Sequence, residues 1–292
     1  MYYLFSLLSG ILISGQLALN GGLTNLYGPY SASVIIHIAG LILIAAIVLI
    51  RREHPFANRK ALSFYLGGAV GLLTTVFTNM AFERISVSAI LALELFAQSA
   101  VGLAIDHYGL LGMPKYPFRK QKLIGLLLIL CGIVSMITSF EFFAVLVALL
   151  SGVTVIVSRT LNARLAECTS VRISTLFNYL VGLALAIPVY FLLGRHEVSV
   201  AQFQFYPNWY LYLGGTLGVC MILFCNMTVA KISALYFTLF SFLGQVFSGI
   251  LIDALIDGAF SPRNLIGGVF VTAGLLVNLL LDRRQAKVKK AN

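Results

Sequence analysis

Residues 67–106 read GGAVGLLTTVFTNMAFERISVSAILALELFAQSAVGLAID, and residues 214–253 read GGTLGVCMILFCNMTVAKISALYFTLFSFLGQVFSGILID. The two stretches align without a gap at an offset of 147 residues, and twelve of the 40 aligned pairs are identical. Apolar identities mean little in so apolar a chain, because few residue types are in use. The more informative polar and glycine identities are Gly67/Gly214, Gly68/Gly215, Gly71/Gly218, Asn79/Asn226, Ser86/Ser233, Gln98/Gln245, Gly102/Gly249 and Asp106/Asp253. The chain therefore contains an internal repeat.

The repeat continues on both sides of this block, mostly at an offset of 142 residues. The further matches are LLSG at 7–10 and 149–152, Asn20/Asn162, Gly40/Gly182, and LIG at 123–125 and 265–267. We therefore divide the chain into a first repeat over 1–139, a second repeat over 140–282, and a basic cytoplasmic tail over 283–292.

Composition identifies the class of protein. The chain has 292 residues, of which 60% are hydrophobic and 10% charged, whereas soluble domains are roughly 45–50% apolar and about 25% charged. A membrane span needs about 20 apolar residues, and backbone polar groups in lipid must be satisfied within the span, which favours helices. The sequence predicts an all-α membrane protein whose ten spans are 3–26, 31–50, 61–82, 86–105, 121–139, 142–163, 173–193, 208–230, 233–252 and 264–281. We expect the first segment to be a retained span, since it lacks a charged leader and a clear cleavage site.

Charge sets the expected orientation. The net charge is +10, but the basic residues stand in short loops beside apolar runs, which indicates membrane topology and not nucleic-acid binding. With both termini in the cytoplasm, 16 of the 20 Lys and Arg residues fall on the inside, three fall outside, and Arg159 lies within a span. We therefore expect a multi-pass protein of a bacterial-type plasma (inner) membrane.

The odd number of spans in each repeat has a mechanical consequence. Two copies of a five-span unit must enter the membrane from opposite sides, which makes them inverted-topology repeats. Exchanging the conformations of such halves turns an inward-open state into an outward-open one, as alternating access requires. Inverted repeats also occur in channels, so a channel or scramblase remains the alternative.

Several residues carry a family resemblance. They are Ser9-Gly10, Gly15-Gln16, Asn20-Gly21, Leu23, Gly67-Gly68, Gly71, Gln98 and the run DHYGLLG at 106–112. With them the first half resembles the YdcZ-type family of the drug/metabolite transporter superfamily, and the second half resembles it more loosely, since Ser158 replaces Gln16. The resemblance implies a ten-helix transporter, as a fused pair of five-span units, with the substrate pathway between the halves.

Glu94 is the leading candidate for a functional site. An ionisable group within a span costs about 2.5–3.5 kcal/mol on insertion scales, so it usually faces a cavity or a partner. Gln98 lies four residues on and shares its helical face, and the repeat places Ser241 and Gln245 opposite this pair. Glu94 could bind a cationic substrate or carry a coupling proton; the structural alternative is a protonated side chain that bonds a neighbouring helix.

Other polar residues in the spans have two interpretations each. We expect Gln16 to face the cavity, and Asn20 and Asn162 either to bridge helices or to bind substrate. His37, opposite Tyr179 in the repeat, is a helix-bridging or a proton-relay residue. Arg159 either extends to the cytoplasmic headgroups or binds an anionic group, which would reverse the substrate charge expected from Glu94.

These features predict a secondary transporter of a small polar molecule (a cation, an amine or a metabolite), which it exports in exchange for protons or another coupling ion. A membrane-embedded enzyme would need paired carboxylates, a His-Glu-x-x-His helix or a Ser/His pair in the spans, so we expect no enzyme. No phosphate-binding GxxxxGK[ST] loop and no paired metal spacing among the four cysteines occur, so we expect no cofactor and no metal. The expected partners are the substrate and the bilayer, with the protein a monomer or a homodimer.

Overall fold

The computed structural model describes residues 2–57, 60–110, 120–136, 141–197, 204–229, 234–258 and 260–291. These residues form α-helices and short 3-10 helices and contain no strand. The elements are α1 (Tyr2–Tyr27), α2 (Pro29–Ile50), η1 (Leu62–Tyr65), α3 (Leu66–Phe82), α4 (Val87–Tyr108), α5 (Lys122–Met136), α6 (Phe142–Cys168), α7 (Val171–Leu193), η4 (Trp209–Leu213), α8 (Gly214–Val229), α9 (Ala234–Asp257) and α10 (Pro262–Ala291).

The helices agree with the expected spans. Seven of the described helices are long and apolar enough to cross a membrane, and three shorter apolar stretches are Lys122–Met136, Trp209–Cys225 and Phe240–Ile256. The all-helical, membrane-type fold is therefore confirmed.

Two boundaries differ from the expectation in a matched way. The spans predicted to begin at 61 and 208 start instead with the 3-10 helices η1 and η4, each leading into the glycine pair of its repeat. Short 3-10 pieces are common at helix starts. The backbone of α10 continues through the predicted tail to Ala291. Arg59, Lys115, Arg119 and Lys231, on which part of the charge bias rests, and Leu111 and Gly112 of the resemblance motif lie outside the described residues.

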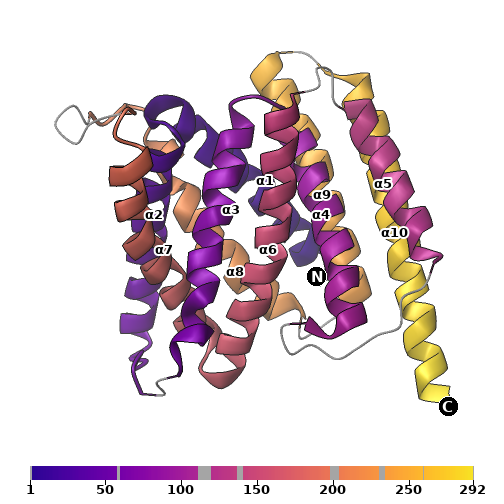
Figure 1. Ribbon diagram of the computed structural model, residues 1–292, viewed down its shortest axis with the longest axis horizontal. Helices are drawn as coiled ribbons and strands as arrows, with labels where there is room; N and C mark the ends of the chain where they lie inside the picture. The colour runs from indigo at the N-terminus through magenta and orange to yellow at the C-terminus, as the bar shows by residue number, and fades with distance from the viewer. Residues whose placement is uncertain are drawn as a thin grey trace.

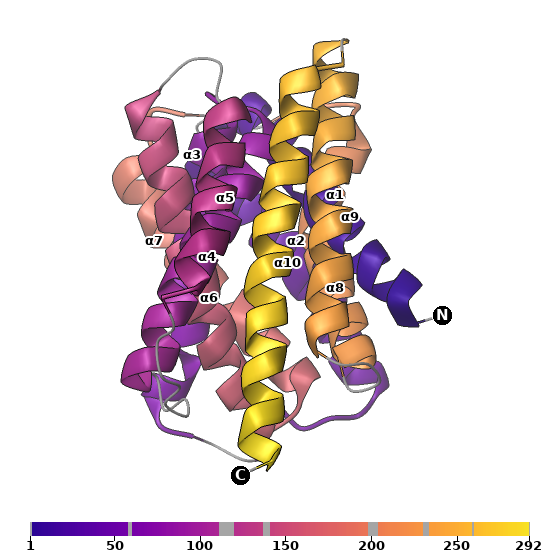
Figure 2. The same ribbon diagram turned by 90° about the vertical axis from the view of Figure 1, so that its right-hand side faces the viewer.

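The helices form a single bundle with a pair at each edge. Figures 1 and 2 show α5 beside α10 at one edge, and Figure 1 shows α2 beside α7 at the other. Helices α1, α3, α4, α6, α8 and α9 lie between the two pairs. Most large contacts join one half to the other, as in α1 with α9 and α3 with α6.

Glycines permit these close contacts, and they do so at matching positions. A Cβ on Gly10 of α1 would lie 2.6 Å from the backbone nitrogen of Gln245 on α9. A Cβ on Gly152 of α6 would lie 2.5 Å from the carbonyl oxygen of Glu94 on α4. Gly10 and Gly152 are equivalent in the repeat, so each half presents its first helix to the fourth helix of the other in the same way. Small residues at such crossings let helices pack closely in lipid.

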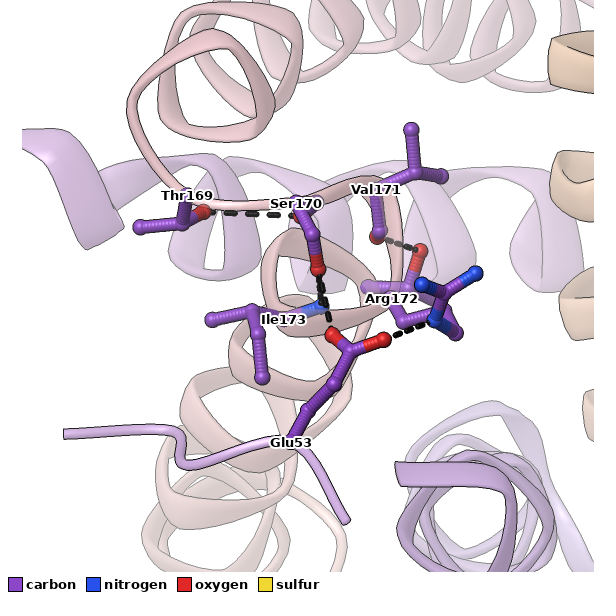
Figure 3. Close-up of polar contacts among 7 residues, drawn as sticks. Glu53, Thr169, Ser170, Val171, Arg172 and Ile173 are labelled. Carbon is purple, nitrogen blue, oxygen red and sulfur yellow. Dashed lines mark hydrogen bonds and ion pairs between the residues drawn. The ribbon is translucent and has the colours of Figure 1, made fainter. Parts of the chain in front are cut away.

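A glutamate ties the end of α2 to the start of α7. Arg52 turns the chain with a positive φ of 54°, and Glu53 then reaches the first turn of α7. Its Oε2 accepts a hydrogen bond of 2.7 Å from the Ser170 hydroxyl, and its Oε1 is ion-paired with the Arg172 guanidinium (Figure 3). Ser170 in turn caps α7 by accepting from the Ile173 N–H at 3.1 Å.

A second glutamate makes the reverse connection. Glu197 follows α7 and accepts hydrogen bonds from the backbone N–H groups of Tyr30 (3.1 Å) and Ser31 (2.8 Å) at the start of α2. A carboxylate at a helix N-terminus satisfies free N–H groups and complements the helix dipole. Gly28 precedes α2 with φ 86°, and its missing side chain leaves the space that the Glu197 carboxylate occupies.

Candidate functional site

A cavity of about 200 Å³ lies inside the bundle. Residues of α1, α2, α3, α4, α6, α7 and α8 line it, so both halves contribute. Of the candidate residues it brings together Glu94, Gln16, Asn20, His37, Asn162, Arg159 and Tyr179.

Glu94 is buried, with 6% of its surface exposed. Its Oε1 accepts hydrogen bonds from the Thr78 hydroxyl of α3 (2.8 Å) and the Ser151 hydroxyl of α6 (2.6 Å). No residue in the described part of the chain donates to Oε2, although the side chain lines the cavity. The protein therefore holds one carboxylate oxygen through hydroxyl groups from two other helices.

Gln98, one turn further along α4, binds Arg159. Its Oε1 accepts a hydrogen bond of 3.1 Å from Nη1 of Arg159 on α6. Gln98 is buried, whereas Arg159 is exposed and lines the cavity. Arg159 thus contacts Gln98 at the wall of the cavity, and binding of an anionic group stays a prediction.

A second cavity of about 310 Å³ adjoins the first and shares Ile13, Arg159, Asn162, Asn178, Met221 and Ile222 with it. It contains Ser241 and Gln245 of α9, the counterparts of Glu94 and Gln98. The Ser241 hydroxyl accepts from Ser9 of α1 at 3.2 Å, and Ser9 is equivalent to the Ser151 that binds Glu94. The two repeats thus share a contact between a serine of their first helix and the fourth helix of the other repeat, but the contacted residue is a glutamate only in the first repeat.

His37 and Tyr179 lie edge to face, with ring centroids 5.8 Å apart. Nδ1 of His37 lies 2.7 Å from the Ser33 carbonyl oxygen of its own helix. A carbonyl oxygen only accepts, so Nδ1 carries a proton, and in the neutral ring Nε2 is the acceptor. The Tyr179 hydroxyl donates to the Gly215 carbonyl at 3.0 Å and so joins α7 to α8.

The amides differ in how they are satisfied. Asn162 donates to the Asn178 side chain at 2.7 Å, which links α6 to α7 as the bridging interpretation predicts. Asn20 is buried and lines the first cavity, and none of the described residues donates a hydrogen bond to its side-chain oxygen. Gln16 lines the same cavity. A buried acceptor without a partner carries a desolvation cost that a ligand donor would relieve.

Thr78, Ser151 and Asn178 were not identified from the sequence, although they hold Glu94 or line both cavities. Ser151 could have been found, because it matches Ser9 in the repeat. Thr78 and Asn178 have no such signal. In the described part of the chain, no group of three His, Cys, Asp or Glu side chains could hold a metal ion.

The two ends of the cavities differ. The second cavity extends to Ala166 and Val171, where α6 ends and α7 begins. At the opposite end the cluster of Leu23, Tyr27, Ala32, Ile36 and Leu211 closes the bundle. The Tyr27 hydroxyl donates to the Gln204 carbonyl at 2.6 Å and contacts the Tyr212 hydroxyl.

Asp253 of α9 holds the first turn of α4, which lies at the same end of the bundle as the Tyr27 cluster. The Asp253 carboxylate accepts from the backbone N–H groups of Val87 (2.7 Å) and Ser88 (2.9 Å). These bonds cap α4 and join the end of α9 to it. Asp253 therefore contributes to the closed end of the bundle.

Comparison with known proteins agrees with this architecture. A family model described as "Putative inner membrane exporter, YdcZ" matches residues 1–135 and again 143–277. The chain belongs to the YdcZ family. The two matches confirm that a YdcZ unit occurs twice in the chain, and they support a membrane transporter over an enzyme.

The fold has a solved relative. A structure described as "Crystal structure of protein" superposes with a TM-score of 0.65 over 97% of this YdcZ-family chain and 98% of that chain, at 19% identity. At this identity the likeness concerns the fold alone. No curated protein matches the chain.

Proposed function

We propose that this YdcZ-family protein is a secondary transporter that exports a small polar molecule by proton-coupled alternating access. One observation carries the proposal: the buried Glu94 carboxylate lines a cavity that both halves share, and one of its oxygens accepts hydrogen bonds from Thr78 and Ser151 while the described residues donate none to the other. A buried carboxyl group in a span is typical of proton and substrate pathways.

The chain spans the membrane ten times, with two five-helix repeats of opposite orientation and both termini in the cytoplasm. The double family match, the matched approaches at Gly10 and Gly152 and the matched hydroxyl pairs at Glu94 and Ser241 support this arrangement. In such repeats the coupled site lies between the halves.

The described conformation is inward-facing. In the predicted orientation the junction of α6 and α7 is cytoplasmic, and the second cavity extends toward it. The Tyr27 cluster and the Asp253 cap then close the outer side. An exporter in this state would receive its substrate from the cytoplasm.

Glu94 couples the substrate to the proton. The Thr78 and Ser151 hydroxyls can donate to either form of the carboxyl group, because hydroxyl protons rotate. A proton and a substrate group would compete for Oε2. The neighbouring Gln16, Asn20 and His37 complete a polar wall of the first cavity.

The test is flux in proteoliposomes that contain the native protein, the Glu94→Gln variant or a Glu141→Gln control. Glutamine can accept from Thr78 and Ser151 but cannot exchange a proton, so we expect at least a tenfold loss of pH-gradient-driven flux. Glu141 forms an exposed ion pair with Arg84, and neither residue lines a cavity, so its variant keeps native flux. Native pH dependence in Glu94→Gln would contradict the proposal.

A further inference from the structure

Arg159 stands at the junction of the two cavities. It lines both of them, and it is the one charged side chain among the described residues that line the second cavity. A molecule that moves from the second cavity to Glu94 in the first therefore passes the guanidinium. A purely cationic substrate would meet a like charge on this route.

The guanidinium has unused hydrogen-bonding capacity. It carries five N–H donors, and Gln98 accepts from Nη1. Among the residues that the structure describes, no carboxylate lies within ion-pair distance of it. Its charge lies near enough to the Glu94 carboxylate to interact with it without forming an ion pair, and a planar guanidinium fits a carboxylate through two parallel hydrogen bonds.

The two charges come from different halves. Arg159 lies on α6 of the second repeat, where its counterpart on α1 is Leu17. Glu94 lies on α4 of the first repeat, where its counterpart is Ser241. Among its described lining residues the cavity system thus contains one carboxylate and one guanidinium, and neither charge is duplicated by the repeat.

We infer that Arg159 is the anion-binding residue of the substrate site and that the substrate is a small zwitterion, with its carboxylate on Arg159 and its amine toward Glu94. Gln98 is a positioning residue that orients the guanidinium. Glu94 and Gln98 lie one helical turn apart on α4, about 6 Å along the axis, and Gln98 binds Arg159, which places the carboxylate and the guanidinium on one side of the cavity system. The inference rests on the proposed function for its substrate site, and it replaces the cation or amine expected from Glu94 alone.

The test uses matched probe sets with the full chain. Alanine, leucine and phenylalanine are each compared with the corresponding amine (ethylamine, isopentylamine, phenethylamine) and acid (propionate, 4-methylpentanoate, 3-phenylpropionate). Binding is measured as thermal stabilisation in detergent, and flux is measured in proteoliposomes. We expect at least one amino acid to bind about tenfold or more tightly than both of its partners, since a charge-assisted hydrogen bond typically gives that discrimination.

Three variants accompany the probes. Arg159→Gln should lose at least about tenfold in affinity for the amino acid, while its affinity for the amine stays constant or rises. Arg159→Lys keeps the positive charge but lacks the planar guanidinium, so its affinity for the amino acid should lie between those of the native protein and Arg159→Gln. Arg164→Gln is the control, because Arg164 is on the same helix but stacks on Phe64 and lines neither cavity.

The outcomes separate the two claims. Equal binding of amines and amino acids, no binding by any probe, or unchanged amino-acid binding in both Arg159 variants overturns the zwitterion inference. Amine flux without amino-acid flux supports transport and overturns the inference. Amino-acid binding that depends on Arg159 without flux supports the inference and overturns the proposed transport.

Discussion

Glu53 and Glu197 hold opposite ends of the same helix pair. Glu53 follows α2 and binds Ser170 and Arg172 at the start of α7, while Glu197 follows α7 and binds the start of α2. Both contacts are present in one conformation. We therefore expect α2 and α7 to move as one body, with access to the cavity opening between other helices.

Acid should weaken the Glu53 contact. Burial raises the pKa of Glu53, but hydrogen bonds from Ser170 and Arg172 and the charges of Arg172 and Arg51 outweigh it, so the pKa lies below the usual value. A depressed pKa gives stability that is present above the pKa of the unfolded chain, about 4.3, and that is lost as pH falls through the folded pKa. Because the pair is partly exposed, Glu53→Gln should cost about 1 kcal/mol at neutral pH.

The measurement is the thermal midpoint in detergent from pH 7 to pH 3. The native midpoint should fall more steeply than that of Glu53→Gln below about pH 4.3, the unfolded pKa. Glu141→Gln, in the exposed pair with Arg84, should follow the native curve. The prediction is wrong if the thermal midpoints of the native protein and of Glu53→Gln fall equally steeply with pH.

Gly28→Ala should destabilise the protein by about 1–3 kcal/mol, because alanine rarely adopts such a backbone conformation and its Cβ would displace the Glu197 carboxylate. Gly258→Ala is the matched control, since Gly258 has φ 67° but open space around it. Gly28 also has ψ 161°, a backbone region that glycine almost alone adopts, so its variant should lose more stability in chemical unfolding than Gly258→Ala. Equal losses would contradict the prediction.

Gly152→Ala should separate α4 from α6, because its Cβ would meet the Glu94 carbonyl and the Ala97 side chain. We expect a loss of about 1–3 kcal/mol and reduced flux, since Ser151 would move away from Glu94. Gly102→Ala, on α4 with nothing within 4 Å of the added Cβ, should stabilise the helix by about 0.5–1 kcal/mol. Thermal unfolding in detergent measures both changes: the midpoint should fall for Gly152→Ala and rise for Gly102→Ala.

Asp253→Ala should loosen the outer end of α4. Removing a side chain that caps a helix costs about 0.5–2 kcal/mol, so amide exchange at Val87 and Ser88 should rise by up to about 30-fold. Hydrogen exchange followed by mass spectrometry over 86–95 measures this. Asn264→Ala removes a single long bond of 3.4 Å to Asp253 and should have a smaller effect; an equal effect would assign the cap to Asn264.

Much of the fold was predictable because apolar length and loop charge have direct physical meaning in a membrane. The apolar pattern also identified Glu94, Gln16 and His37 as candidate site residues, because few polar side chains interrupt the predicted spans. Their shared cavity confirms a common location, while their roles in binding remain predictions.

Other features depend on the direction of a side chain, which hydropathy does not determine. Arg159 could have extended to the headgroups, and its bond to Gln98 follows from how α4 and α6 cross. The Glu53 and Glu197 contacts lie in loops of different sequence, RREHP and GRHEV, at an offset of 144. The residues that these two glutamates contact are not identical at equivalent positions of the repeat, so the repeat did not reveal the contacts.

The crossed packing of the halves has a consequence for assembly. The main core contains Leu17 of α1, Ile90 of α4, Val147 of α6 and Val246 of α9, so each half is completed by helices of the other. We therefore expect that neither half folds stably without the other. Severing the chain between α5 and α6 should leave two fragments that are unstable alone and recover their structure when they are made in the same cell, as the subunits of an obligate dimer do.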